Sequence, residues 1–318
     1  MKKYQVITLC VFVIVIVGLF GFCASSSSKP AEDDNSQDCP EVSDVPPYVH
    51  IITVPCVPQE VEFAGEALPL HLFDVRESLE RELIVNMNFH SSTLQYLKRI
   101  TRFFPVIEPI LAANGIPDDF KYLALIESDF LYRVSPAGAT GFWQFMRAAA
   151  TDYGLEMSDE VDERYHLEKA TTAACRYLRD AYRMFNNWTL VAASYNMGMA
   201  GLQSRLRQQQ VDSYYDLWLS EETMRYVFRI AAVKLILTDP EKYGFHMPEE
   251  EMYRPIPFTE IKVDGAVTSW IDFALEHKTN YKMIRVLNPW IRDTKLTNRA
   301  RKTYMVRIPA EGVRGVTE

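Results

Sequence analysis

The sequence predicts a mainly α-helical protein that ends in a small β-α-α-β module. From about Asp74 to Thr238, apolar residues recur at spacings of three and four, as on one face of an amphipathic helix. Helix-stop signals such as Asn114-Gly115 divide this pattern into segments. Beyond about residue 255, short alternating stretches flank two brief helical patterns, which indicates a second architecture.

Within the helical region, the segment after Asn114-Gly115 begins with Pro117 and two acids, which suit the first turn of a new helix. The other helices are expected at about 96–104, 105–113, 168–185, 189–196 and 222–237, after a first amphipathic segment around residues 79–85.

The tail is expected to form a separate module over residues 255–310. Ile261–Val263 is short and β-branched, and Val267–Leu275 has helical spacing. Asn280 is placed to cap a second helix. Apolar residues alternate along Tyr304–Ile308, as they do in a strand with one buried face.

The N-terminus, residues 1–23, is typical of an export signal. Lys2 and Lys3 precede the apolar run Val6–Phe22, which small residues follow. At about 17 residues, this run is at the lower limit for crossing a bilayer, so a retained signal anchor is the alternative to a cleaved peptide. Cys23 is a candidate for lipidation, although the bulky Phe22 before it disfavours this.

Residues 24–60 are predicted to be an acidic, disordered linker, because they hold seven acids against one lysine and show no hydrophobic period. The main folded part is then expected at 61–250. The formal net charge of -8 gives no basic surface for nucleic acid, so no nucleic-acid partner is expected.

The cysteines suggest neither a metal site nor a cofactor. Cys39, Cys56 and Cys175 lie beyond the signal segment, are odd in number and lack metal-ligand spacing. A Cys39–Cys56 disulfide is one option, and Cys175 fits a buried small hydrophobe within a helix.

Glu127 is the first residue that points to chemistry. It lies on the apolar stripe of the helix opened by Pro117, where burial disfavours the charged form and should raise the carboxyl pKa. A glutamic acid that keeps its proton near neutral pH can serve as a general acid. The structural alternative is a helix-end glutamate that bonds to nearby backbone.

Three later segments give this glutamate a context. The small-residue turn Ser135–Gly141 lets a ligand approach the backbone, and Phe142–Met146 adds aromatic surface with one amide, a mixture that suits sugars. Ala192–Gly198 ends a helix with a tyrosine and an asparagine, and Glu222–Val227 looks like a helix start. Taken singly, each of these segments also has a purely structural interpretation.

Together the four segments resemble the lytic transglycosylase family, which has a lysozyme-like catalytic domain. The resemblance rests on the ordered motifs Glu127-Ser128, Ser135 to Met146, Ala193 to Gly198, and Glu222 to Val227. The Gly-Phe-Trp-Gln-Phe variant looks most similar to membrane-bound members. Arg147 departs from the family, which usually has proline there, and little effect on catalysis is expected.

The resemblance implies that Glu127 is the acid–base catalyst. It also implies a glycan-binding groove built from Ser135, Gln144, Met146, Tyr195, Asn196, Glu222 and Tyr226. The tail resembles a degenerate LysM module on the basis of Val263-Asp264-Gly265, Leu287-Asn288-Pro289 and Ile308-Pro309.

The implied function is cleavage of peptidoglycan glycan strands without water, metal or cofactor, which leaves 1,6-anhydromuramyl ends. The implied location is the cell envelope, on the periplasmic side, with membrane attachment through the N-terminus as an option. The alternatives are a lysozyme-type hydrolase and a non-catalytic peptidoglycan-binding protein.

Overall fold

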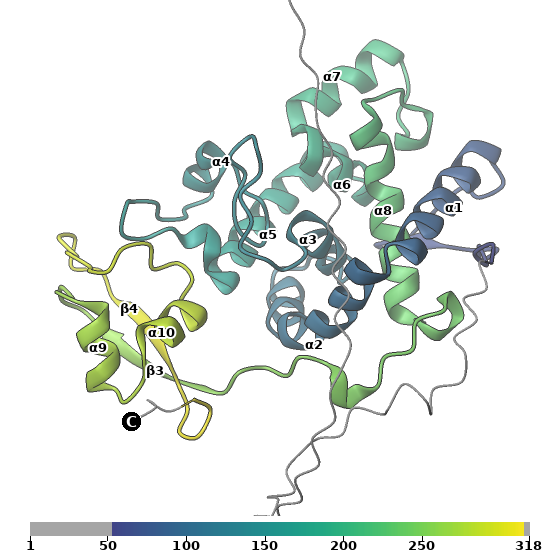
Figure 1. The fold of residues 1–318 in the computed structure, drawn as a ribbon. Coiled ribbons are helices and arrows are strands. Elements are labelled where there is room, and N and C mark those ends of the chain that lie inside the picture. Colours follow the sequence, from purple (N-terminus) through teal and green to yellow (C-terminus); the bar gives the residue numbers. More distant parts are fainter. Residues whose placement is uncertain (1–52, 315–318) are drawn as a thin grey trace, which may run out of the picture. The chain divides into compact units, whose positions relative to one another are not determined.

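The computed structural model describes residues 53–314, so the expected signal at 1–23 and most of the linker at 24–60 lie outside the described residues. Figure 1 shows helices α1–α8 in the first part of the chain and a smaller group, β3, α9, α10 and β4, near its C-terminal end. The first part contains β1 (Glu62–Phe63), β2 (Glu66–Ala67), α1 (Phe73–Asn88), α2 (His90–Ala113), α3 (Phe120–Ser128), α4 (Arg147–Asp152), α5 (Leu167–Phe185), α6 (Trp188–Met197), α7 (Met199–Gln209) and α8 (Glu221–Thr238), and the second contains β3 (Phe258–Val263), α9 (Trp270–Glu276), α10 (Tyr281–Leu287) and β4 (Tyr304–Pro309).

Side-chain caps define several helix starts. Asn187 accepts a hydrogen bond from the Leu190 N–H at the start of α6. Asn280 does the same for the Met283 N–H of α10, as its position in the sequence predicts. Such caps satisfy backbone donors that have no partner within the helix.

Helices α2, α4 and α7 differ from expectation. The segments 96–104 and 105–113 form one helix, α2, which continues through Pro105 and Pro109. Proline removes a helical hydrogen bond, but Phe104, Ile107 and Leu111 keep one buried stripe across that point, and this tertiary packing outweighs the local penalty. Helices α4 and α7 were not expected, because each has one buried residue, Ala150 and Leu202 respectively, and their sequences carry little periodic signal.

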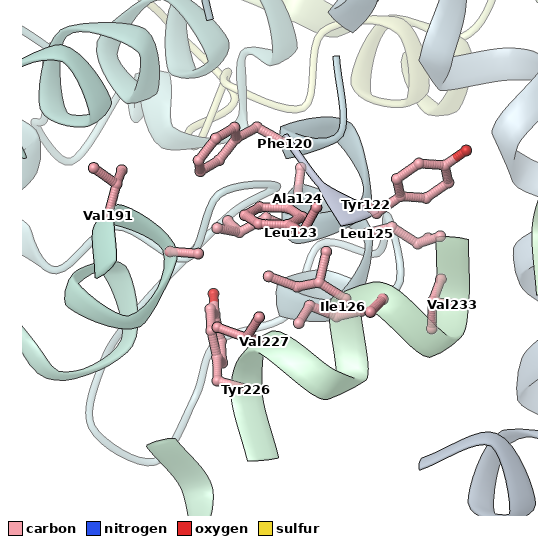
Figure 2. Packing of buried hydrophobic residues seen from close by; sticks show 14 of the residues in the cluster. Phe120, Tyr122, Leu123, Ala124, Leu125, Ile126, Val191, Tyr226, Val227 and Val233 are labelled. Carbon is pink, nitrogen blue, oxygen red and sulfur yellow. The ribbon is translucent and has the colours of Figure 1, made fainter. Parts of the chain in front are cut away.

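Helix α3 lies within the main hydrophobic core. Figure 2 shows α3 side chains packed beside Val191 of α6 and Tyr226, Val227 and Val233 of α8. Most of α3 is buried, which explains why so short a helix holds its place. The buried α3 residues are Phe120, Tyr122, Leu123, Ala124, Leu125, Ile126 and Ser128.

The tail has the element order that the sequence predicts. Strands β3 and β4 pair antiparallel, with Ile261 opposite Val306 and Val263 opposite Tyr304. The two short helices α9 and α10 lie between them in the chain.

The core of the tail also takes in residues from the helical part. Val161 and Tyr165 are 1% and 4% exposed, and they pack with tail residues such as Trp270, Ile284 and Val306. Both belong to the segment 156–166, which we call the bridging loop. The tail is therefore joined to the helical part by a shared hydrophobic cluster as well as by the chain connection.

Polar contacts surround that shared cluster. The Asp162 N–H donates to the Trp290 carbonyl at 2.9 Å, and the Arg292 N–H donates to the Glu160 carbonyl at 2.8 Å. Arg307 of β4 also pairs with Glu168 of α5. Because backbone groups on both sides are satisfied by this contact, separating the parts would expose unpaired donors as well as apolar surface.

Two further findings concern the described residues. None of the helices within 53–314 combines the length and the apolar character needed to span a bilayer. Cys175 is buried in α5 as predicted, whereas Cys56 is exposed and its candidate partner Cys39 lies outside the described range.

The bridging loop generates the first prediction. Val161→Asp would place a carboxylate without a partner in the shared cluster, at a cost of several kcal/mol. We expect the tail to separate from the helical part, which should make the chain between residues 244 and 258 sensitive to limited proteolysis. Mass spectrometry of the fragments locates the cleavage. Val54→Asp is the matched control, because Val54 is 78% exposed. Equal protection of the tail in the Val161→Asp variant would contradict the shared-core interpretation.

Candidate active site

Glu127 lies on the last turn of α3, where the chain turns sharply. Asp129 and Phe130 have φ angles of 53° and 52°, a region that residues other than glycine seldom adopt. The buried Ser128 hydroxyl donates to the Phe142 carbonyl at 2.9 Å and accepts from the Phe130 N–H at 3.2 Å. Ser128 thus fastens the end of α3 to the loop that carries the next motif.

Asp129 is held in its unusual conformation by three neighbours. Its carboxylate accepts from the Tyr96 hydroxyl at 2.6 Å and pairs with Arg133 at 2.7 Å. Its carbonyl accepts from Arg99 at 2.9 Å. These contacts offset the backbone strain of the turn that follows Glu127.

The Glu127 carboxyl has a raised pKa, as its place on an apolar stripe predicts. Burial is the largest cause. The hydroxyl of Tyr226 donates a hydrogen bond to Oε1, which together with the positive charge of Arg229 acts in the opposite direction, while the negative charge of Glu222 adds to the rise. The net effect favours a protonated carboxyl, the form that a general acid needs.

Loop 133–146 faces this helix end and is closed by its own polar groups. The Ser135 hydroxyl oxygen accepts from the Ala139 N–H at 3.0 Å. Gln144 has a positive φ of 47°, and its amide nitrogen donates to the Gly141 carbonyl at 2.8 Å. Both side chains therefore shape the loop, and the Ser135 O–H remains a donor for other partners.

Arg164 supports this loop through both its side chain and its backbone. Its guanidinium pairs with the Asp162 carboxylate at 2.7 Å and donates to the Phe145 carbonyl at 3.2 Å. The backbone of Arg164 also lies close to Gly141, whose φ is 83°. A Cβ on Gly141 would lie 2.0 Å from the Arg164 carbonyl oxygen, so only glycine fits there.

A chain of hydrogen bonds joins α6, α8 and the loop. The Tyr195 hydroxyl donates to the Trp143 carbonyl at 2.7 Å. The Asn196 amide donates to Glu222 at 3.0 Å and accepts from the Thr223 hydroxyl at 2.7 Å. The Tyr–Asn pair at the end of α6 is thus tied on one side to the loop and on the other to the start of α8.

The structure brings together most of the site residues that the sequence predicts. Glu127 contacts Tyr226, and Asn196 contacts Glu222. Ser135, Gln144 and Tyr195 bond within or to loop 133–146, while Met146 is exposed just before α4. Within residues 53–314, no group of three or more His, Cys, Asp or Glu side chains is arranged to hold a metal ion.

Sequence reasoning missed Arg229, Arg164 and Asp129. Arg229 follows Glu222 by seven residues, so helical spacing alone places it on the Glu222 face of α8 and would have found it. Arg164 and Asp129 had no such signal. Arg164 binds the Phe145 carbonyl and Asp129 binds the Tyr96 hydroxyl, and both partners are distant in the sequence.

Comparison with known proteins defines the class of these domains. Residues 105–217 match the family described as "Transglycosylase SLT domain". Residues 259–312 match the "Soluble lytic transglycosylase C-terminal LysM-like domain". The chain therefore carries a transglycosylase SLT domain followed by a LysM-like domain. The SLT match includes Glu127 and ends before Glu222 and Tyr226.

Particular relatives point in the same direction. The chain is 26% identical over 203 residues to membrane-bound lytic murein transglycosylase D of Escherichia coli K12, and equally to that of Escherichia coli O6:H1. Each match covers 61% of this chain and 44% of the relative, so the chain spans less than half the length of either.

One solved structure is also similar, an inactive variant of lytic transglycosylase Slt from Pseudomonas aeruginosa. It shares 18% identity over 58% of this chain and 36% of its own, with a TM-score of 0.37. Nothing about the fold of the present chain follows from a likeness of that size.

The contact between Gly141 and Arg164 generates the second prediction. Gly141→Ala should destabilise the protein by roughly 3 kcal/mol or more, because a left-handed φ and a backbone clash add together. Gly138→Ala is the matched control: its φ is 86° but no atom lies within 4 Å of the added Cβ. We expect about 1–2 kcal/mol for the control. Urea denaturation measures both, and equal losses would show that the Arg164 contact is unimportant.

Proposed function

We propose that this protein is a lytic transglycosylase that cleaves the β-1,4 bond between N-acetylmuramic acid and N-acetylglucosamine in peptidoglycan. The observation that carries the proposal is the Glu127 carboxyl, whose pKa is raised by burial and which accepts a hydrogen bond from Tyr226. The SLT match and the relatives named as murein transglycosylases support the substrate class.

The reaction uses Glu127 twice. Protonated Glu127 gives its proton to the glycosidic oxygen while the bond from that oxygen to the muramyl C1 breaks. The N-acetyl carbonyl of the substrate stabilises the positive charge at C1. The Glu127 carboxylate then takes the proton of the muramyl C6 hydroxyl, whose oxygen bonds to C1 and closes a 1,6-anhydro ring. The atoms balance without water.

Tyr226 and Arg229 support the second half of this cycle. Once Glu127 has lost its proton, the carboxylate keeps the hydrogen bond from the Tyr226 hydroxyl. Burial raises the pKa of Tyr226, so this hydroxyl stays protonated and remains a donor. Arg229 contributes a positive field at Glu127. These two groups stabilise the ionised state that acts as the base.

Two other carboxylates near this helix end are already engaged. Asp129 is bound by Tyr96 and Arg133, and Glu222 by Asn196. An inverting glycosidase needs a second carboxylate free to activate water. Their engagement favours a one-carboxylate mechanism over hydrolysis, which is the reason to place transglycosylation ahead of lysozyme-type cleavage.

The remaining predicted residues are proposed to form the walls of a glycan groove. Loop 133–146 supplies one wall, and the ends of α6 and α8 supply the other. The proposed groove residues are Ser135, Gln144, Met146, Tyr195, Asn196, Glu222 and Tyr226. We propose residues 61–250 as the catalytic domain and 255–310 as an accessory module that assists binding to glycan strands.

The proposed location is the cell envelope, where peptidoglycan lies. The sequence signal at residues 1–23 supports export, with membrane attachment through the same segment as an option. The E. coli relatives are named as membrane-bound, which is consistent with this placement.

The product distinguishes the proposal from its rivals and is the third prediction. Digests of purified murein made in heavy-oxygen water should yield 1,6-anhydromuramyl ends that carry no label, because water is not the acceptor. Mass spectrometry reads both features. Glu127→Gln, shown to be folded by circular dichroism, should reduce cleavage by about 10²–10⁴-fold or more, since it cannot move a proton.

Label in the new muramyl ends would replace transglycosylation with hydrolysis. Near wild-type cleavage by Glu127→Gln would remove Glu127 from the mechanism. Absence of cleavage by the wild-type protein would favour a non-catalytic wall-binding role.

The fourth prediction concerns pH. Activity that needs protonated Glu127 must fall as the pH rises through the Glu127 pKa. Tyr226→Phe keeps the buried ring but removes a hydrogen bond that lowers this pKa. The alkaline limb of the kcat/KM profile should therefore move to higher pH. A limb that stays in place or moves to lower pH would contradict the assignment.

A further inference from the structure

The bridging loop is bound to the tail along one side. Val161 and Ile291 pair as an isolated antiparallel bridge, and each is 1% exposed. Beside this bridge, the Glu160 carbonyl accepts from the Arg292 N–H at 2.8 Å. The Glu160 carboxylate accepts from the N–H and the hydroxyl of Thr297 at 2.8 and 3.0 Å. Backbone, side-chain and apolar contacts therefore fix the loop to the tail together.

Asp162 connects this docked side to the other side of the bridging loop. Its N–H donates to the Trp290 carbonyl at 2.9 Å. Its carboxylate accepts from Arg164 at two points, from Nε at 3.0 Å and from Nη2 at 2.7 Å. Asp162 and Arg164 are 9% and 8% exposed. Because a two-point pair of this kind has a narrow geometry, one residue relates the position of the tail to that of the guanidinium.

Arg164 extends these contacts to loop 133–146. Its Nη1 donates to the Gly138 carbonyl at 3.3 Å and to the Phe145 carbonyl at 3.2 Å. Its own carbonyl oxygen lies against Gly141, where an added Cβ would be 2.0 Å away. The side chain and backbone of Arg164 thus contact three points of the turn that carries part of the proposed groove.

Tyr165 provides a second contact between the same parts. Its ring is buried in the tail core, with the Arg292 guanidinium 4.2 Å from the ring centroid. On the other side it meets the Tyr132 ring at a centroid distance of 6.1 Å, and Tyr132 meets Phe142 of the loop at 5.4 Å. The tail and loop 133–146 are therefore joined by a polar route through Asp162 and by an aromatic route through Tyr165.

We propose that the docked tail fixes the position of loop 133–146 through Asp162 and Arg164, and thereby raises the affinity of the groove for glycan. The groove itself rests on the proposed function. Asp162 and Arg164 are positioning residues, since both are buried and act through the loop. A loop without this support would occupy several positions, and a glycan strand would have to order it on binding, which costs affinity. The tail then acts on the catalytic domain, in addition to any contact of its own with the cell wall.

The first experiment measures the link between tail and loop without substrate. Backbone N–H groups of Ser135, Thr140 and Phe145 are hydrogen-bonded within the loop, so amide hydrogen exchange of full-length protein reports its opening. Ile291→Ala loosens the tail contact from the tail side, and exchange in loop 133–146 should become about tenfold faster. Ile271→Ala makes the same change in the tail at a side chain that is 48% exposed, and it should leave the loop unchanged.

A second variant tests the route through Asp162. Asp162→Asn keeps the N–H that binds Trp290 but weakens the hold on Arg164, so the loop should exchange faster while α10 in the tail stays protected. Asp159→Asn is the matched control, because it makes the same change at an exposed position of the same bridging loop. Peptides from α3 and α8 report opening of the whole catalytic domain and should keep their wild-type exchange in every variant.

The functional consequence is measured as affinity. Calorimetry with soluble glycan fragments uses full-length Glu127→Gln protein, which is not expected to cleave them. Ile291→Ala and Asp162→Asn should each raise the Kd about tenfold at unchanged stoichiometry, because the loop must be ordered on binding. The double variant should lose less than about twofold beyond either single variant, as expected for two changes on one route.

Unchanged exchange of loop 133–146 in Ile291→Ala would overturn the link between tail and loop. Faster exchange with an unchanged Kd would overturn its effect on binding, and additive losses in the double variant would show two independent effects in place of one route. A lower stoichiometry at unchanged Kd would show partial unfolding, which is a purely structural role. Failure of the Glu127→Gln protein to bind glycan, or labelled products from the wild-type protein, would instead overturn the proposed groove or mechanism, whereas exchange tests the link itself.

Discussion

The contact between the end of α3 and the face of α8 is the constraint on which the site depends. It places Glu127 where burial raises its pKa, and it supplies the Tyr226 hydroxyl that donates a hydrogen bond to the carboxyl. Opposed influences of this kind suit the proposed role of Glu127, in which the carboxyl first gives a proton and then takes one. The apolar packing of α3 on α6 and α8 is therefore part of the chemistry, because it sets the environment of a single carboxyl (Figure 2).

The loop opposite α3 depends on a buried arginine. Arg164 binds the loop backbone, pairs with Asp162 and leaves room for no side chain at Gly141. The same bridging loop contributes Val161 and Tyr165 to the core of the LysM-like domain. One short segment thus supports the loop opposite α3 and also packs in the core of the tail.

Charge is distributed unevenly around α8. The pairs Arg225–Glu82 and Arg81–Glu221 join α8 to α1, whereas Arg229 has no such partner among the described residues. The positive charge of Arg229 instead acts on the Glu127 carboxyl, whose pKa it lowers against the larger effect of burial.

The sequence by itself determined the mainly helical class, the β-α-α-β tail and the apolar-stripe position of Glu127, because these follow from local periodicity, caps and turns. It also contained the spacing of Glu222, Tyr226 and Arg229. The tertiary structure alone decided that α2 runs through Pro105, that Tyr226 bonds to Glu127, and that the tail shares a core with Val161. These features depend on contacts between residues far apart in the chain, whose packing energy overrides local preference and leaves no periodic trace in the sequence.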